Sequence, residues 1–150
     1  MAVKALASKL NGYQRVALDT APFIYHFEDN PQYVSLTREL FNRIEKGQLM
    51  AITSALTLTE VLTGPKSEGD KDLVAKYQRV FGVFPNLHIT AIDIQVAVRA
   101  ADLRANFGLK TPDALQLAVA IGEGAQLFVT NDSRLKNVSD IEILVLDDYV

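Results

Sequence analysis

The chain has 150 residues, of which 49% are hydrophobic and 22% charged, and its formal net charge is −3. This length predicts a single domain over residues 1–150 with a sizeable core, and the lack of a basic surplus does not favour nucleic-acid binding unless a local basic patch or bound metal ions compensate. There is no cysteine, which excludes disulfides, thiolate zinc sites and cysteine nucleophiles and suits the reducing cytoplasm.

No apolar run approaches the roughly 20 residues that span a bilayer. The first ten residues lack the long apolar segment of a signal peptide, so we expect a short surface helix or a frayed end there. The sequence therefore predicts a cytoplasmic protein without a membrane partner.

Short apolar or β-branched runs alternate with longer segments of helical periodicity. In chain order, strands are predicted at Arg15–Leu18, Leu49–Ile52, Leu87–Thr90, Leu127–Thr130 and Ile141–Leu146. Helices are predicted at Tyr33–Glu45, Ser54–Thr63, Lys71–Phe81, Ile92–Phe107 and from Thr111 onward. This alternation predicts an α/β fold with three layers, α/β/α, around a mainly parallel sheet.

Turn and capping residues set the expected limits of these elements. Gly64-Pro65 is expected to end the second helix and to open a surface loop over Gly64–Lys71, and Gly108 is expected to close the fourth. Thr111 is a candidate N-cap of the last helix, with Pro112 in its first helical position. That helix is apolar over Ala114–Ile121 apart from Gln116, so we expect it to be buried on most sides.

Four carboxylates stand at or inside these elements. Asp19 and Asp132 follow the first and fourth predicted strands, Asp113 lies in the first turn of the buried helix, and Glu60 lies inside an apolar helix. Because ligands of a parallel sheet bind at the carboxyl ends of its strands, the four are expected to converge there. Oxygen-only ligands suit Mg²⁺ or Mn²⁺, which indicates metal-assisted phosphodiester hydrolysis.

Each acid also has an ordinary structural interpretation. Asp19 could cap the following helix, Asp113 could stabilise a helix N-terminus, Asp132 could be a turn residue and Glu60 could face solvent. Two histidines, His26 and His88, would permit a metal-free acid–base ribonuclease, although packing or surface roles are expected for both.

The segments around the four acids resemble those of a known family. Val16–Thr20 resembles the first strand of PIN domains, Leu58–Leu62 their second acid, Thr111–Ala118 their third-acid helix, and Leu127–Asp132 their last strand with its Thr-x-Asp ending. The resemblance covers residues 15–146 and is closest to the VapC-like toxin ribonuclease branch. One position differs, because Ala21 stands where the family commonly has Asn or Ser.

The resemblance implies a homodimeric endoribonuclease that uses Mg²⁺ or Mn²⁺, cuts RNA, and is inhibited by a small antitoxin in a type II toxin–antitoxin pair. Asp19, Glu60, Asp113 and Asp132 would be its catalytic and metal-binding residues. Thr20, Thr130 and Asn131 are expected to support the site by orienting the metal-binding residues. Contacts to RNA phosphates are expected from Lys110, Arg134 and Lys136.

Two other functions are compatible with the sequence. A non-catalytic PIN-like binding module would explain the altered position 21. A phosphatase of the haloacid-dehalogenase type also places an Asp after its first strand, but it needs a second Asp at the position of Ala21. A Mn²⁺-dependent RNA cleavage assay separates the nuclease from the binding module.

Overall fold

Five short strands form one wholly parallel sheet in the computed structural model, which describes residues 2–150. The strands are β1 (Arg15–Leu18), β2 (Met50–Ser54), β3 (Leu87–Thr90), β4 (Leu127–Thr130) and β5 (Glu142–Val145). Their order across the sheet is β3-β2-β1-β4-β5. All pairs are parallel because each connection between strands carries the chain back across the sheet through helical segments.

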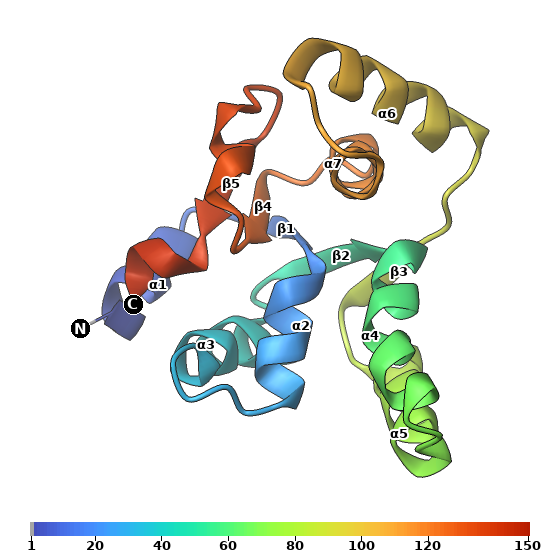
Figure 1. The fold of residues 1–150 in the computed structure, drawn as a ribbon. Helices are drawn as coiled ribbons and strands as arrows, with labels where there is room; N and C mark the ends of the chain where they lie inside the picture. Colours follow the sequence, from blue (N-terminus) through green and yellow to red (C-terminus); the bar gives the residue numbers. More distant parts are fainter. Residues whose placement is uncertain (1) are drawn as a thin grey trace.

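Helices cover both faces of this sheet. They are α1 (Ala2–Leu10), α2 (Thr20–Phe27), α3 (Val34–Glu45), α4 (Ala55–Ser67), α5 (Lys71–Val83), α6 (Ile94–Phe107), α7 (Thr111–Gly122), and the 3₁₀ turns η1 (Ser133–Asn137) and η2 (Leu146–Tyr149). Figure 1 shows α6 and α7 on one side of the strands and α2 and α3 on the other. The predicted α/β class with a parallel central sheet is confirmed.

Alternation along the strands divides the interior into two cores. Val16 and Leu18 of β1 face the core that is covered by α1 to α5, whereas Ala17 faces the core that is covered by α6 and α7. Within α7, Ala114 and Leu117 are fully buried in the second core. The expectation of a helix that is buried on most sides is thus confirmed.

The strand order reverses between β1 and β4. From β1 the chain proceeds outward to β2 and β3, and it then crosses back through α6 and α7 to β4, which pairs directly with β1. The segment after β1 enters α2 on one face, whereas the second core on the other face holds Leu135 of η1, which follows β4. Such a reversal point opens a ligand-binding crevice at the carboxyl ends of the strands.

The observed limits of the elements correct two predictions. Helix α4 does not end at Gly64-Pro65 but continues to Ser67, so the predicted loop begins later. Pro65 stands only two residues before the end of α4 and therefore removes a single hydrogen bond from its last turn. The N-cap of α7 is Lys110 rather than Thr111, while Gly108 closes α6 in the left-handed conformation as predicted.

The N-terminal segment forms helix α1 and buries Leu6 and Leu10 against the first core. In residues 2–150, none of the helices combines the length and the apolar character needed to cross a bilayer.

Candidate functional site: a carboxylate cluster at the strand reversal

Asp19 lies at the carboxyl end of β1 and is the N-cap of α2. Its Oδ1 accepts a hydrogen bond from the backbone N–H of Thr20 at 2.8 Å, and its Oδ2 accepts one from Thr130 Oγ1 at 2.7 Å. Desolvation raises the pKa of Asp19, although both hydrogen bonds oppose the shift. Among the described residues, no lysine or arginine forms an ion pair with this carboxylate.

Glu60 is joined to Asp19 through Thr20. The Thr20 hydroxyl donates to Glu60 Oε1 at 2.6 Å, while the backbone N–H of the same residue donates to Asp19. Because Thr20 is buried, this two-way contact fixes the distance between the end of β1 and helix α4. The interpretation of Asp19 as a helix cap therefore holds together with a role in a carboxylate cluster.

Thr130 connects Asp19 to Asp132 in the same manner. Its hydroxyl donates to Asp19 and accepts the backbone N–H of Asp132 at 3.1 Å. The side chain of Asp132 forms a bidentate ion pair with Arg134, whose Nε and Nη2 donate to the two carboxylate oxygens at 3.0 and 2.7 Å. This hydrogen-bonded guanidinium lowers the pKa of Asp132. Asp132 thus differs from Asp19 in having a cation of its own.

Asp113 projects from the first turn of α7 into a pocket of about 170 Å³ that it shares with Asp132, Lys110 and Arg134. Burial and then the charge of Asp132 raise the pKa of Asp113, and the charges of Arg134 and Lys110 partly offset this. An anion at this helix N-terminus is also favoured by the helix dipole.

The four carboxylates therefore gather at one end of the sheet without forming a closed cage. The charges of Asp113 and Glu60 raise the pKa of Asp19, and the charges of Asp132 and Glu60 act on Asp113. Within the described part of the chain, however, no three acidic or histidine side chains are close enough to hold a metal ion by themselves. Asp113 and Asp132 line one pocket, whereas Glu60 lines a different one.

These donors fit a divalent cation of the Mg²⁺ type. Mg²⁺ is usually held by one or two carboxylates, with water and substrate phosphate completing its shell. The partly buried Asp19 carboxylate, which forms no ion pair in the described part of the chain, is the group whose charge such a cation would balance. Asp113 and Glu60 are coupled to it electrostatically.

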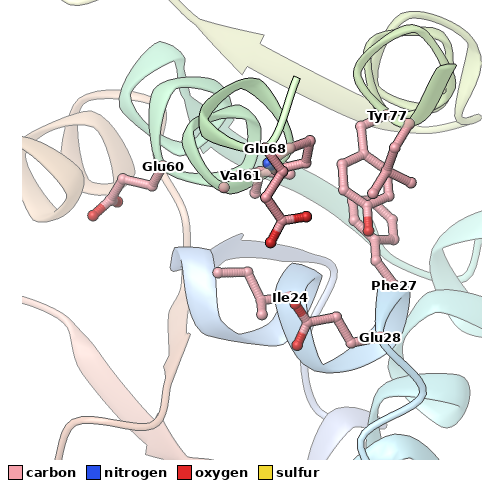
Figure 2. A pocket seen from close by; sticks show the side chains of 10 residues that line it. Ile24, Phe27, Glu28, Glu60, Val61, Glu68 and Tyr77 are labelled. Atoms are coloured by element: carbon pink, nitrogen blue, oxygen red, sulfur yellow. The ribbon is translucent and has the colours of Figure 1, made fainter. Parts of the chain in front are cut away.

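The pocket lined by Glu60 has a volume of about 190 Å³ and lies between α2, α4 and α5. Figure 2 shows Glu60 at one side of this pocket and Glu68 and Glu28 farther along it, with Ile24, Phe27 and Tyr77 among its apolar and aromatic walls. This groove therefore offers apolar surface and negative charge together.

Within residues 2–150, the side chain of Asn131 forms no hydrogen bond with the side chains of the four acids. Its Nδ2 donates to Tyr25 Oη at 3.0 Å and its Oδ1 accepts the backbone N–H of Asp147 at 2.8 Å. The amide thereby ties the segment after β4 to α2 and to the C-terminal turn η2. Of the three predicted phosphate contacts, Arg134 and Lys110 line the Asp113 pocket, while Lys136 pairs with Asp148 at 2.6 Å.

The two histidines belong to separate surroundings. His26 stacks on Phe41 with a centroid distance of 4.6 Å, and its Nδ1 lies 3.1 Å from Thr37 Oγ1. His88 lies in β3 and is exposed. The structure therefore gives no support to a histidine acid–base pair.

Sequence reasoning missed a group of buried polar residues beneath the acids: Thr53, Ser54, Thr57 and Gln116. One signal was available, because Gln116 is the single polar residue within Ala114–Ile121 and lies one helical turn after Asp113.

The sequence profile described as PIN domain matches residues 16–141. The chain belongs to the PIN-domain family. A search of curated proteins finds no match.

Several solved structures share the fold of this PIN domain. A chain of a toxin–antitoxin complex from Klebsiella pneumoniae is 20% identical, with a TM-score of 0.67 over 87% of this chain and 97% of the other. A chain of VapBC2 from Rickettsia felis, bound to a promoter DNA fragment, is 18% identical, with a TM-score of 0.71 over 88% of this chain and 98% of the other. A chain of DNA-bound VapBC from Salmonella typhimurium is 23% identical, with a TM-score of 0.69 over 89% of this chain and 98% of the other. At these identities the likeness concerns the fold.

Ala21 leaves this PIN domain without a polar side chain two positions after its first acid. The Asp19 carboxylate is nevertheless held at both oxygens, by the backbone of Thr20 and the hydroxyl of Thr130. Both oxygens of the first acid therefore have hydrogen-bond partners other than residue 21.

Proposed function

We propose that this PIN domain is a metal-dependent endoribonuclease that hydrolyses RNA phosphodiester bonds with Mg²⁺ or Mn²⁺, and that it is the toxin of a type II toxin–antitoxin pair. The observation that carries the proposal is the partly buried Asp19 carboxylate where the strand order reverses between β1 and β4, which is hydrogen-bonded on both oxygens and, within residues 2–150, forms no ion pair with a cationic side chain. Glu60 and Asp113 add negative charge to the same site.

Each acid has a distinct role in this proposal. Asp19 and Asp113 would hold the cation, and Glu60 and Asp132 would complete the catalytic site from α4 and from the segment after β4. When bound, the cation activates water and stabilises the leaving oxygen. Arg134 and Lys110 stand at the rim of the Asp113 pocket, where they would bind RNA phosphates.

Replacement of Asp19 tests this assignment. We expect Asp19→Asn to lower Mn²⁺-dependent cleavage of RNA by more than about 100-fold, since altering the partners of metal ligands alone typically costs 10–100-fold. Cleavage of a structured RNA is measured with Mn²⁺ and with EDTA. Asp102→Asn, which makes the same change at an exposed position of α6, is the control and should cleave like the parent. Cleavage that persists in EDTA would contradict the metal mechanism.

The binding-module alternative draws support from the ion pair between Asp132 and Arg134, because a neutralised acid is a poor metal ligand. A binding module would retain RNA in a gel-shift assay and leave it uncut with Mn²⁺. The nuclease proposal requires cleavage under those conditions.

We further propose that the protein forms a homodimer and that its antitoxin inserts a segment with apolar and basic side chains into the groove beside Glu60. The apolar walls of this groove would bury the apolar residues, and its three glutamates would attract an arginine or lysine. A basic side chain that reaches Glu60 would neutralise the carboxylate charge that a bound metal ion otherwise balances.

Co-expression with any small DNA-binding protein that the neighbouring gene encodes tests the antitoxin interaction, and light scattering tests the homodimer. We expect a stable complex without ribonuclease activity, weakened by Glu68→Lys, which leaves the acids at the crevice unchanged. Light scattering should give a dimer at micromolar concentration. A monomer would contradict the homodimer, and a complex whose groove is unobstructed would contradict the blocking mechanism.

A further inference from the structure

A buried amide lies at the centre of a hydrogen-bonded network beneath the acids. The side chain of Gln116 on α7 is only 4% exposed. Its Oε1 accepts from Ser54 Oγ at 2.5 Å, and its Nε2 donates to Thr57 Oγ1 at 2.8 Å and to Thr20 Oγ1 at 3.3 Å. One amide therefore joins α7 to the end of β2, to α4 and to α2.

Gln116 lies within one helical turn of one of the acids. The same holds for Thr20 and Thr57, which accept hydrogen bonds from its Nε2. The pairs are Asp113 with Gln116, Glu60 with Thr57, and Asp19 with Thr20. Residues three apart in a helix share a face. A shift of the amide would therefore move the three acid-bearing segments relative to one another.

The amide also occupies an acceptor position on both threonine hydroxyls, because its two N–H hydrogens go to Thr20 and Thr57. The single hydroxyl hydrogen of Thr20 is donated to the Glu60 carboxylate, which can only accept, at 2.6 Å. Thr57 Oγ1, which lies 3.2 Å from Thr20 Oγ1, is the competing acceptor. Loss of the amide would allow the Thr20 hydroxyl to turn from Glu60 to Thr57.

We propose that Gln116 is a positioning residue that fixes Asp19, Glu60 and Asp113 relative to one another through the hydroxyls of Thr20 and Thr57. The inference rests on the proposed metal-dependent function, which it deepens: Gln116 sets the ligand geometry without contacting metal or RNA. Preorganised sites tolerate errors of only about 0.5 Å in ligand position. A small shift of α7 against α4 would therefore lower the affinity for the metal ion.

The test is Mn²⁺ binding measured by titration calorimetry on the whole chain. Gln116→Met keeps the length of the side chain and removes both donors and the acceptor. We expect it to weaken Mn²⁺ binding by roughly 10–100-fold, the usual effect of losing a partner of a metal ligand. The matched control is Gln126→Met. Gln126 accepts two backbone N–H groups at the other end of β1, from Gln14 and Arg15, so its loss should leave Mn²⁺ affinity unchanged.

Substitution at Thr57 gives a second route if Gln116→Met fails to fold. Thr57→Val removes the hydroxyl at nearly constant shape and is expected to weaken Mn²⁺ binding, whereas Thr57→Ser should restore it. Because both positions act through one network, the double variant should bind Mn²⁺ no worse than the weaker single variant. Full affinity in folded Gln116→Met or Thr57→Val would overturn the proposal.

Failure of the proposed function would look different, since the parent itself would then bind no Mn²⁺. Crystal structures of the metal-free parent and of Gln116→Met would decide the positioning role in that case. Displaced Glu60 and Asp113 carboxylates would support it, and unchanged ones would overturn it.

Discussion

Asp113→Asn is expected to abolish RNA cleavage and yet leave the metal-free protein as stable as the parent, or more stable. Burial and neighbouring carboxylates raise the pKa of Asp113 in the folded protein. A carboxyl group with a raised folded pKa favours folding at low pH, and this contribution is lost as the pH rises through the raised value. At neutral pH the ionised group therefore opposes folding, and a neutral amide of the same size removes that cost.

Thermal melts in EDTA and in Mn²⁺ measure this effect. In EDTA, the parent should lose stability relative to Asp113→Asn as the pH rises from the acidic range, because only the parent carries the carboxyl group with the raised pKa. With Mn²⁺ the order should invert, because bound metal stabilises only the protein that can hold it.

If Asp113 had a purely structural role, the expected effects of Asp113→Asn on stability and cleavage would be the opposite. If this residue only favours the dipole of α7, asparagine should cost about 0.3–1 kcal/mol and leave any cleavage untouched. A variant that melts lower in EDTA, responds to Mn²⁺ like the parent and still cuts RNA would exclude Asp113 from the metal site. Asp102→Asn again serves as the control for the chemical change itself.

Thr130→Val should reduce both stability and activity, since a single buried hydroxyl serves two partners. Thr130 is fully buried, and its loss leaves Asp19 Oδ2 without a donor and the backbone N–H of Asp132 without an acceptor. Leaving a buried polar group unsatisfied costs about 1–3 kcal/mol. Loss of a residue that orients a metal ligand typically lowers activity by about 10–100-fold.

Thermal unfolding and Mn²⁺-dependent cleavage should be measured on the same preparation. Thr130→Ser keeps the hydroxyl and should recover most of the activity while losing only the packing of a methyl group. Parental activity in Thr130→Val would show that Asp19 does not need this donor. Valine and serine variants with equally low activity would point to packing rather than to hydrogen bonding.

The elements of the fold were predictable because each carries its own local pattern. The short apolar runs of β1 and β4, the helical periodicity of α3 and the left-handed Gly108 after α6 depend on neighbours in sequence. The end of α4 did not follow the local rule: Pro65 lies inside the helix, where it removes one hydrogen bond, and it lines the groove between α2, α4 and α5.

The gathering of the acids at one edge was likewise predictable from the alternation of strands and helices, since Asp19 and Asp132 had to follow the carboxyl ends of parallel strands. The assignment of Asp19, Glu60, Asp113 and Asp132 as metal ligands remains a prediction. Their individual environments could not be read from the chain. The guanidinium of Arg134 pairs with Asp132, whereas Asp19 forms no ion pair with any other described residue.

The sequence by itself determined the parallel α/β architecture, the buried character of α7 and the residue types available for chemistry, because these follow from periodicity and composition. Tertiary structure alone decided that β1 lies beside β4, that Thr20 and Thr130 both hold Asp19, and that Gln116 joins three distant segments. Those contacts link residues up to 111 positions apart. Their geometry depends on how strands order and helices pack, which no local pattern specifies.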